Sequence, residues 1–153
     1  MSDITRVAVI DDHPLYRAGI RQVVDASDDM EVVAEGADAA DALQLAQSNG
    51  HELMLLDLNI PGGGIDAARV IARSNPGIKI VFLTNSESEA NVSAVMQAGA
   101  RGYIVKGIGG TELMDILRLV QNGEQYVTPS LGALALRSLG RARAVGAGNL
   151  HLL

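Results

Sequence analysis

Four short apolar runs in this chain each end abruptly at a charged or hydroxyl residue, and this pattern constrains the fold more than any other feature. The runs lead into Asp11-Asp12, Asp57, Thr84 and Lys106. Short, nearly continuous apolar runs that alternate with helical stretches are typical of buried parallel strands. Ligands of open parallel sheets bind outside the carboxyl ends of the strands. The sequence therefore predicts that three acids, one hydroxyl and one amine converge on one edge of a sheet.

Strand and helix signals alternate five times along the chain. The expected strands are Arg6–Ile10, Glu31–Glu35, Leu53–Leu56, Lys79–Leu83 and Gly102–Val105. The expected helices are Pro14–Asp25, Asp38–Gln47, Asp66–Arg73, Glu89–Ala98 and Thr111–Asn122. Pro14 suits a first helical turn, and Thr111 is expected to be an N-cap. Five successive strand–helix units indicate an open α/β sheet rather than an eight-stranded barrel.

The composition is that of one globular domain with a tail. Of the 153 residues 48% are apolar, which suffices for a core, and the absence of cysteine excludes disulfides and thiolate chemistry. No run approaches the ~18 uninterrupted apolar residues of a membrane span, and no signal region precedes the first strand, so we expect a cytoplasmic protein without membrane contact. The net charge of −6 argues against nucleic-acid binding by the body itself.

The C-terminal residues differ in character from the rest. Thr128-Pro129 can begin a short helix over Ser130–Leu139, and residues 140–148 have the small, flexible and basic composition of a linker. The five residues that follow are too few for a domain. We therefore expect a domain over residues 1–126, with 127–153 leading to a further domain absent from this chain. The alternative is an ordinary frayed tail.

The acids of the expected site can hold a divalent cation. Clustered carboxylates repel one another unless a cation lies among them or one of them takes up a proton. Oxygen ligands favour Mg²⁺, which usually takes one or two protein carboxylates together with phosphate oxygens. The carboxylate of Asp57 can attack phosphorus and form an acyl phosphate. Lys106 can pair with phosphoryl oxygens as a point charge, and Thr84 can donate a hydrogen bond to them.

Each of these residues also has an ordinary structural interpretation. The acids and Thr84 can serve as turn or capping residues, and a lysine at a strand end is usually solvated. His13 is expected to cap the first helix or to face solvent rather than act as a ligand. The functional interpretation rests on finding these residues together, because all four positions fall at the ends of predicted strands and follow one another in chain order.

Four motifs resemble the receiver domain of two-component response regulators: Asp11-Asp12-His13-Pro14, Asp57-Leu58-Asn59-Ile60-Pro61-Gly62, Thr84 and Lys106. The stretch from Asp12 to Ile20 resembles the NarL/FixJ-type subfamily. The resemblance covers about residues 4–123. It implies a CheY-like (flavodoxin-like) fold of three layers, doubly wound, with a five-stranded parallel sheet of order 2-1-3-4-5.

The resemblance also implies roles for individual residues. Asp57 is the expected phosphoacceptor, and a sensor histidine kinase is the expected donor. Mg²⁺ is expected on Asp11, Asp12, Asp57 and the main-chain carbonyl of Asn59. Thr84 and Lys106 are expected to stabilise the phosphoryl group, and Thr84 with Tyr103 to act as the switch pair. Such a protein is a switch rather than an enzyme, with only its own phosphorylation and dephosphorylation as chemistry.

The expected output is a change on the face formed by Glu89–Ala98, Gly102–Val105 and Thr111–Asn122. Members of the subfamily carry a LuxR-type helix-turn-helix after a linker, so binding to DNA is expected only through a C-terminal domain. A homodimer is expected through this face or through the first and last helices.

Three positions depart from the usual pattern of the family. The loop around Gly63 is one residue shorter and contains three consecutive glycines, which adopt positive φ freely. Gly107 follows Lys106 where many receivers have proline, which predicts a mobile loop and a loosely held lysine. Asn85 follows Thr84 where small residues are common. Gly63 and Asn85 are therefore expected to modulate access to Asp57.

Three other functions compete with the signalling switch. A phosphatase of the haloacid-dehalogenase type needs Asp-x-Asp after the first strand, but here His13 stands two residues after Asp11. A flavin-binding module needs hydroxyl side chains after the first strand to bind the phosphate, and aromatic residues over the flavin ring. This chain has acids after the first strand and only four aromatic residues. An atypical receiver that acts as a phosphorylation-independent interaction module remains the main alternative.

Overall fold

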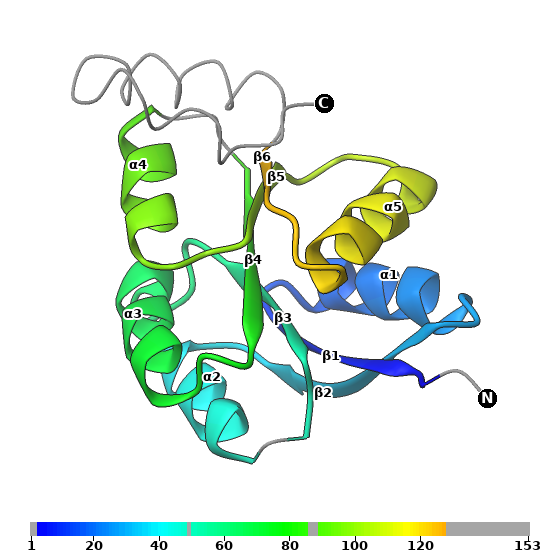
Figure 1. Ribbon diagram of the computed structural model, residues 1–153, viewed down its shortest axis with the longest axis horizontal. Helices are drawn as coiled ribbons and strands as arrows, with labels where there is room; N and C mark the ends of the chain where they lie inside the picture. The colour runs from blue at the N-terminus through cyan, green and yellow to red at the C-terminus, as the bar shows by residue number, and fades with distance from the viewer. Residues whose placement is uncertain (1–2, 49, 86–88, 128–153) are drawn as a thin grey trace.

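The structure is a computed structural model that describes residues 3–48, 50–85 and 89–127. A central sheet lies between two layers of helices (Figure 1). Its strands are β1 (Thr5–Ile10), β2 (Met30–Gly36), β3 (Leu53–Asp57), β4 (Lys79–Thr84), β5 (Gly102–Val105) and β6 (Tyr126–Val127). The helices are α1 (Pro14–Asp25), α2 (Ala39–Gln47), α3 (Gly64–Ser74), α4 (Glu89–Gln97) and α5 (Gly110–Gln121).

The sheet is parallel throughout, and its order is β2-β1-β3-β4-β5-β6. Helices α1 and α5 cover one face, and α2, α3 and α4 cover the other (Figure 1). This is the three-layer, doubly wound, CheY-like architecture with strand order 2-1-3-4-5 that the resemblance to receiver domains implies. The strand β6 extends the predicted sheet by one short strand.

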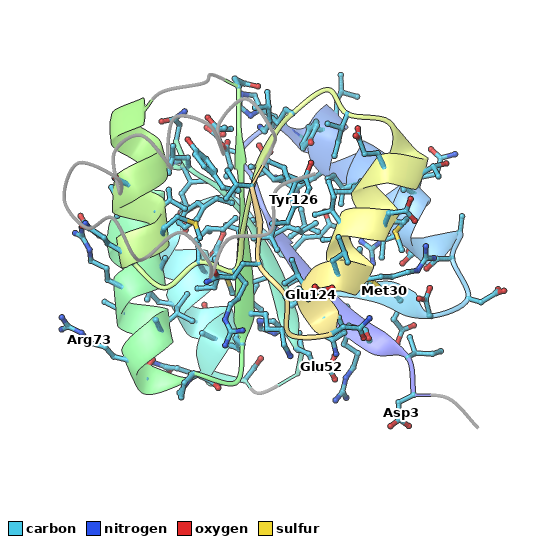
Figure 2. All side chains as sticks on the ribbon, turned by 45° about the horizontal axis from the view of Figure 1, so that its top comes forward. Asp3, Met30, Glu52, Arg73, Glu124 and Tyr126 are labelled. Atoms are coloured by element: carbon cyan, nitrogen blue, oxygen red, sulfur yellow. The ribbon has the colours of Figure 1, made fainter. Side chains whose placement is uncertain are left out.

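Covered faces explain why the strands are apolar runs rather than alternating ones. Along β1, Val7 and Val9 pack in the core beneath α1 and α5, whereas Ala8 and Ile10 pack in the core beneath α2, α3 and α4. Because both faces are buried, every position of a central strand must be apolar. Side chains fill the space on both sides of the sheet, while Arg73 and Asp3 project away from the body (Figure 2). Polar residues are thus left to the strand ends.

The start of α5 corrects one sequence prediction. The helix begins at Gly110, and Gly109 rather than Thr111 is its N-cap. The carbonyl of Gly109 accepts the Leu113 N–H at 3.0 Å. A Cβ on Gly110 would lie 3.1 Å from the Val23 side chain of α1, so the missing side chain lets α5 begin earlier, in contact with α1. The helix α3 likewise begins at Gly64, two residues before its predicted start.

The strand β6 was not predicted because two residues leave no periodicity to detect. Tyr126 pairs with Gly102, and Val127 pairs with Tyr103. The predicted helix at Ser130–Leu139 and the linker after it lie outside the described residues. Within the described part of the chain, no helix combines the length and apolarity needed to cross a bilayer.

A buried histidine lies just before β3, at the end of the strand opposite Asp57. His51 is 5% exposed, and neither ring nitrogen has a hydrogen-bond partner among the described residues. Burial lowers the pKa of His51 below its ordinary 6.5; the nearby charge of Glu52 opposes this shift, and that of Arg6 adds to it. The unfolded chain therefore takes up a proton at a higher pH than the folded chain does.

We expect His51 to make the fold sensitive to acid. The free energy of unfolding should be fully retained above pH 6.5 and should fall as the pH drops below that value, by at most about 1.4 kcal/mol per pH unit from this one group. Urea unfolding at pH 8 and pH 5.5 measures the loss. In His51→Leu the loss between these two pH values should be smaller, and an unchanged loss would contradict the assignment.

Candidate functional site

The strand ends bring the predicted residues to one edge of the sheet. Asp11 and Asp12 follow β1, Asp57 ends β3, Thr84 ends β4 and Lys106 follows β5, and these four strands are neighbours in the sheet. The Lys106 Nζ lies 2.7 Å from Asp11 Oδ2 and 3.4 Å from Asp57 Oδ2. The amine therefore connects the ends of two adjacent strands, β1 and β3, from a third strand.

These three charged groups are nearly out of contact with solvent. The side chains of Asp11, Asp57 and Lys106 are 0%, 1% and 7% exposed. Asp12 differs, because its side chain is 37% exposed and lies at the solvent side of the cluster. One buried amine therefore faces two buried carboxylates and a third, more exposed one, which leaves excess negative charge.

The environments of the two buried carboxylates shift their pKa values in opposite directions. Burial raises the pKa of Asp57, and the nearby charge of Asp11 raises it further; a hydrogen bond from the Asn59 N–H and the Lys106 amine oppose this rise only in part. Burial also acts to raise the pKa of Asp11, but hydrogen bonds from Lys106 and His13 outweigh it and hold the pKa below its ordinary value. Asp57 is thus the carboxylate whose charge is least compensated.

His13 contributes to the site more directly than the sequence suggested. It is the N-cap residue of α1, as expected, but its side chain makes no capping hydrogen bond. Its ring Nδ1 instead lies 2.8 Å from Asp11 Oδ1 and 3.2 Å from Asp12 Oδ1, although the side chain is 57% exposed. The adjacency of the histidine to two acids is the sequence signal for this contact, although a residue that opens a helix more often caps it or faces solvent.

Two further residues of α1 reach the site without any sequence signal. The Lys106 Nζ lies 4.5 Å from the centre of the Tyr16 ring. Arg17 donates from Nη1 to the Asp11 carbonyl at 2.6 Å and from Nε to Glu35 at 3.1 Å. Burial, together with the charges of Asp11 and Asp57, raises the pKa of Tyr16 to about 12. The Lys106 amine thus has three partners, Asp11, Asp57 and the Tyr16 ring, all outside the glycine-rich segment that follows it.

The loop after β3 depends on its glycines. A Cβ on Gly64 would lie 2.8 Å from the carbonyl oxygen of Asp57 and 2.9 Å from that of Leu58, so α3 can start beneath the loop only without a side chain there. Gly63 has φ +92°, a conformation that glycine adopts at low cost. The Asn59 N–H donates to Asp57 Oδ1 at 3.3 Å. The glycine run therefore gives the loop a defined shape next to Asp57.

Thr84 ends β4, and Tyr103 is the second residue of the neighbouring strand β5; both are fully buried. The Lys106 N–H donates to the Thr84 carbonyl at 2.7 Å, which ties the backbone after β5 to the end of β4. Burial raises the pKa of Tyr103, and an interaction with the Thr84 hydroxyl opposes this rise. Asn85 is exposed at the rim beyond Thr84.

The cluster has the donors to bind a divalent cation. Asp11, Asp12, His13 and Asp57 each offer one ligand atom, and these atoms all lie within 4.8 Å of one another. The carboxylate oxygens match the preference of Mg²⁺ for hard ligands. The excess negative charge and the raised pKa of Asp57 indicate that a cation would relieve repulsion there.

Comparison by sequence identifies relatives of the chain. The family model for the response regulator receiver domain matches residues 7–118. Response regulator GacA from Pseudomonas viridiflava is 38% identical over 135 residues, which are 87% of this chain and 63% of that protein. Response regulator UvrY from Escherichia coli K12 is 37% identical over 126 residues, 82% of this chain and 58% of that protein. The chain thus spans about three fifths of the length of these relatives.

Comparison by structure gives the same grouping. A two-component response regulator of the LuxR family from Aurantimonas sp. SI85-9A1 superposes with a TM-score of 0.82 at 29% identity, over 89% of this chain and 98% of that one.

The charge imbalance at Asp57 has a measurable consequence for stability. A raised pKa means that the folded state disfavours the ionised carboxylate, so stability is lost as the pH rises from 3.8 through the folded-state pKa. Without divalent cations, Asp57→Asn should therefore unfold at a higher urea concentration than the wild type at pH 7, and the gain should shrink toward pH 4. The same change at Asp115, whose side chain is 68% exposed, is the control and should give no such gain. Equal midpoints for Asp57→Asn and wild type at pH 7 would contradict this account.

Proposed function

Because this chain belongs to the response regulator receiver family, we propose that Asp57 accepts a phosphoryl group from a sensor histidine kinase. The observation that carries the proposal is the pairing of Lys106 with Asp11 and Asp57 at 2.7 and 3.4 Å. A buried carboxylate with a buried amine beside it is suited to nucleophilic attack on phosphorus. One Oδ of Asp57 forms a bond to phosphorus as the bond between phosphorus and the histidine nitrogen of the kinase breaks. The product is an acyl phosphate on Asp57, and the histidine leaves.

Each neighbour of Asp57 has a role in this proposal. Lys106 pairs with the phosphoryl oxygens, and the Thr84 hydroxyl donates a hydrogen bond to them. The carboxylates of Asp11, Asp12 and Asp57, with the Asn59 carbonyl, hold Mg²⁺. A bound Mg²⁺ supplies positive charge that offsets the charge on the transferring group. Gly63, in the loop after β3, and Asn85, directly after β4, modulate access to Asp57.

We propose Thr84 and Tyr103 as the pair that carries the signal away from Asp57. Both are buried on the adjacent strands β4 and β5, and they interact. When the Thr84 hydroxyl donates a hydrogen bond to the phosphoryl group, its interaction with the Tyr103 hydroxyl changes. The face formed by α4, β5 and α5 then changes its preference for partners, including a second copy of the chain.

We propose that the output of a longer protein lies beyond this domain. The chain spans 63% of the GacA relative, and one solved structure that it resembles is described as a complex of the response regulator RcsB with DNA. In this proposal, residues 1–126 form the receiver and residues 127–153 lead to a DNA-binding domain that regulates transcription. The domain itself is a switch in the cytoplasm, and its chemistry is limited to its own phosphorylation and dephosphorylation.

Phosphoryl uptake is tested by incubating the chain with Mg²⁺ and acetyl phosphate and then measuring its intact mass. We expect one added phosphoryl group, which disappears with a chelator and in Asp57→Asn. Lys106→Ala should retain Mg²⁺ binding but take up the group much more slowly, because the charge beside the phosphoryl oxygens is lost. Asp115→Asn serves as the matched control and should be labelled like the wild type.

Two outcomes would overturn the proposal. Labelling that persists in Asp57→Asn would place the acceptor elsewhere. No labelling of the folded wild-type chain by acetyl phosphate or by a kinase would favour a phosphorylation-independent interaction module.

A further inference from the structure

The glycines that follow Lys106 provide no packing against its side chain, although its backbone N–H is bonded to the Thr84 carbonyl. Gly107 has φ +102°, and a Cβ placed on it would meet no atom within 4 Å. The same is true of the space around Gly109. Such a segment cannot restrict a long side chain by packing, yet Lys106 is only 7% exposed and its amine lies within 4 Å of two carboxylates. The contacts that hold it must come from other elements.

The two carboxylates beside the Lys106 amine do not keep the same charge and ligands throughout the proposed reaction. Asp11 and Asp57 belong to the cluster whose oxygens can bind a divalent cation, and Asp57 is also the proposed phosphoacceptor. Both partners of Lys106 therefore change their charge or their ligands during the proposed reaction. An anchor that serves throughout must be a group that takes no part in these changes.

The ring of Tyr16 meets this requirement. The Lys106 Nζ lies 4.5 Å from the ring centre, inside the range of about 6 Å over which a cation is attracted to an aromatic face. The ring packs against the core between the sheet and helices α1 and α5, and it lines a groove with Ile20, Ile108 and Leu113. Its position is thus set by packing, and a neutral phenol ring does not compete for a hard cation.

We propose that Tyr16 is a positioning residue that holds the Lys106 amine at Asp57 through a cation–π contact. The inference rests on the proposed function for the role of Lys106, but the contact itself does not. Tyr16 acts through Lys106 and does not touch the phosphoryl group. In this chain the aromatic ring of α1 provides the restraint that the glycine-rich segment after Lys106 does not.

The contact is tested first by NMR on the unphosphorylated chain. An amine above an aromatic ring places the neighbouring Lys106 ε-methylene protons in the ring current, so their resonance should be shifted upfield. We expect Tyr16→Phe to retain the upfield shift and Tyr16→Leu to lose it. An unshifted Lys106 resonance in the wild type, or a shift that survives in Tyr16→Leu, would overturn the proposal.

The consequence for reaction is tested by the rate of labelling with acetyl phosphate and Mg²⁺. Loss of a largely desolvated cation–π contact should slow labelling of Tyr16→Leu by roughly tenfold. Tyr16→Phe should restore most of the rate, because the ring and not the hydroxyl makes the contact. Leu15→Ala is the control on the same helix, since Leu15 is 90% exposed, and it should label like the wild type.

The outcomes separate a positioning role from a structural one. Wild-type rates in Tyr16→Leu would refute the proposal, and so would equal losses in Tyr16→Phe and Tyr16→Leu. Should Tyr16→Leu fail to fold, Tyr16→Met provides a flexible apolar replacement of similar length for the same comparison. If the wild type takes up no phosphoryl group, the proposed function fails, but the Lys106 resonance still decides whether Tyr16 holds the amine.

Discussion

The buried amine of Lys106 between the carboxylates of Asp11 and Asp57 is the interaction on which the rest of the site depends. Two carboxylates that are 0% and 1% exposed are costly to bury without a nearby positive charge. Lys106 supplies that charge, with its Nζ 2.7 Å from Asp11 and 3.4 Å from Asp57. Lys106 follows β5, which is separated from β3 in the sheet by β4. The strand order is therefore what makes the contact: a parallel sheet that brings β1, β3, β4 and β5 together at their carboxyl ends places the acids and the amine at one edge.

Lys106 alone does not neutralise the negative charge of the site. One amine opposes two buried carboxylates and the more exposed Asp12, and the raised pKa of Asp57 reflects this imbalance. A divalent cation among these carboxylates can correct it, and their oxygens lie close enough together to bind one. The contacts around the cluster, from Tyr16 and Arg17 on α1 and from the loop shaped by Gly64, hold its members in place.

Much of this arrangement could be predicted from the sequence, for physical reasons that also explain the misses. Apolar runs such as Leu53–Leu56 identify buried strands, and the polar residue that ends each run identifies the edge where they meet. The contact of His13 with the acids was underestimated, because its position at the start of α1 had an ordinary capping explanation. The contact between Tyr16 and Lys106 joins positions 90 residues apart and leaves no local pattern. The start of α5 was misplaced at Thr111, because the packing of Gly110 against Val23 is a tertiary effect.

A crystal structure of the chain with Mg²⁺ and beryllium trifluoride, a mimic of the phosphoryl group, would show whether Lys106 and the acids act together at Asp57. We expect the beryllium trifluoride group on an Asp57 carboxylate oxygen, with the Lys106 Nζ and the Thr84 hydroxyl in contact with its fluorides, and Mg²⁺ among the carboxylates of Asp11, Asp12 and Asp57. Beryllium trifluoride bound elsewhere, or a Lys106 amine directed away from Asp57 in the complex, would show that these groups do not form one phosphoryl site.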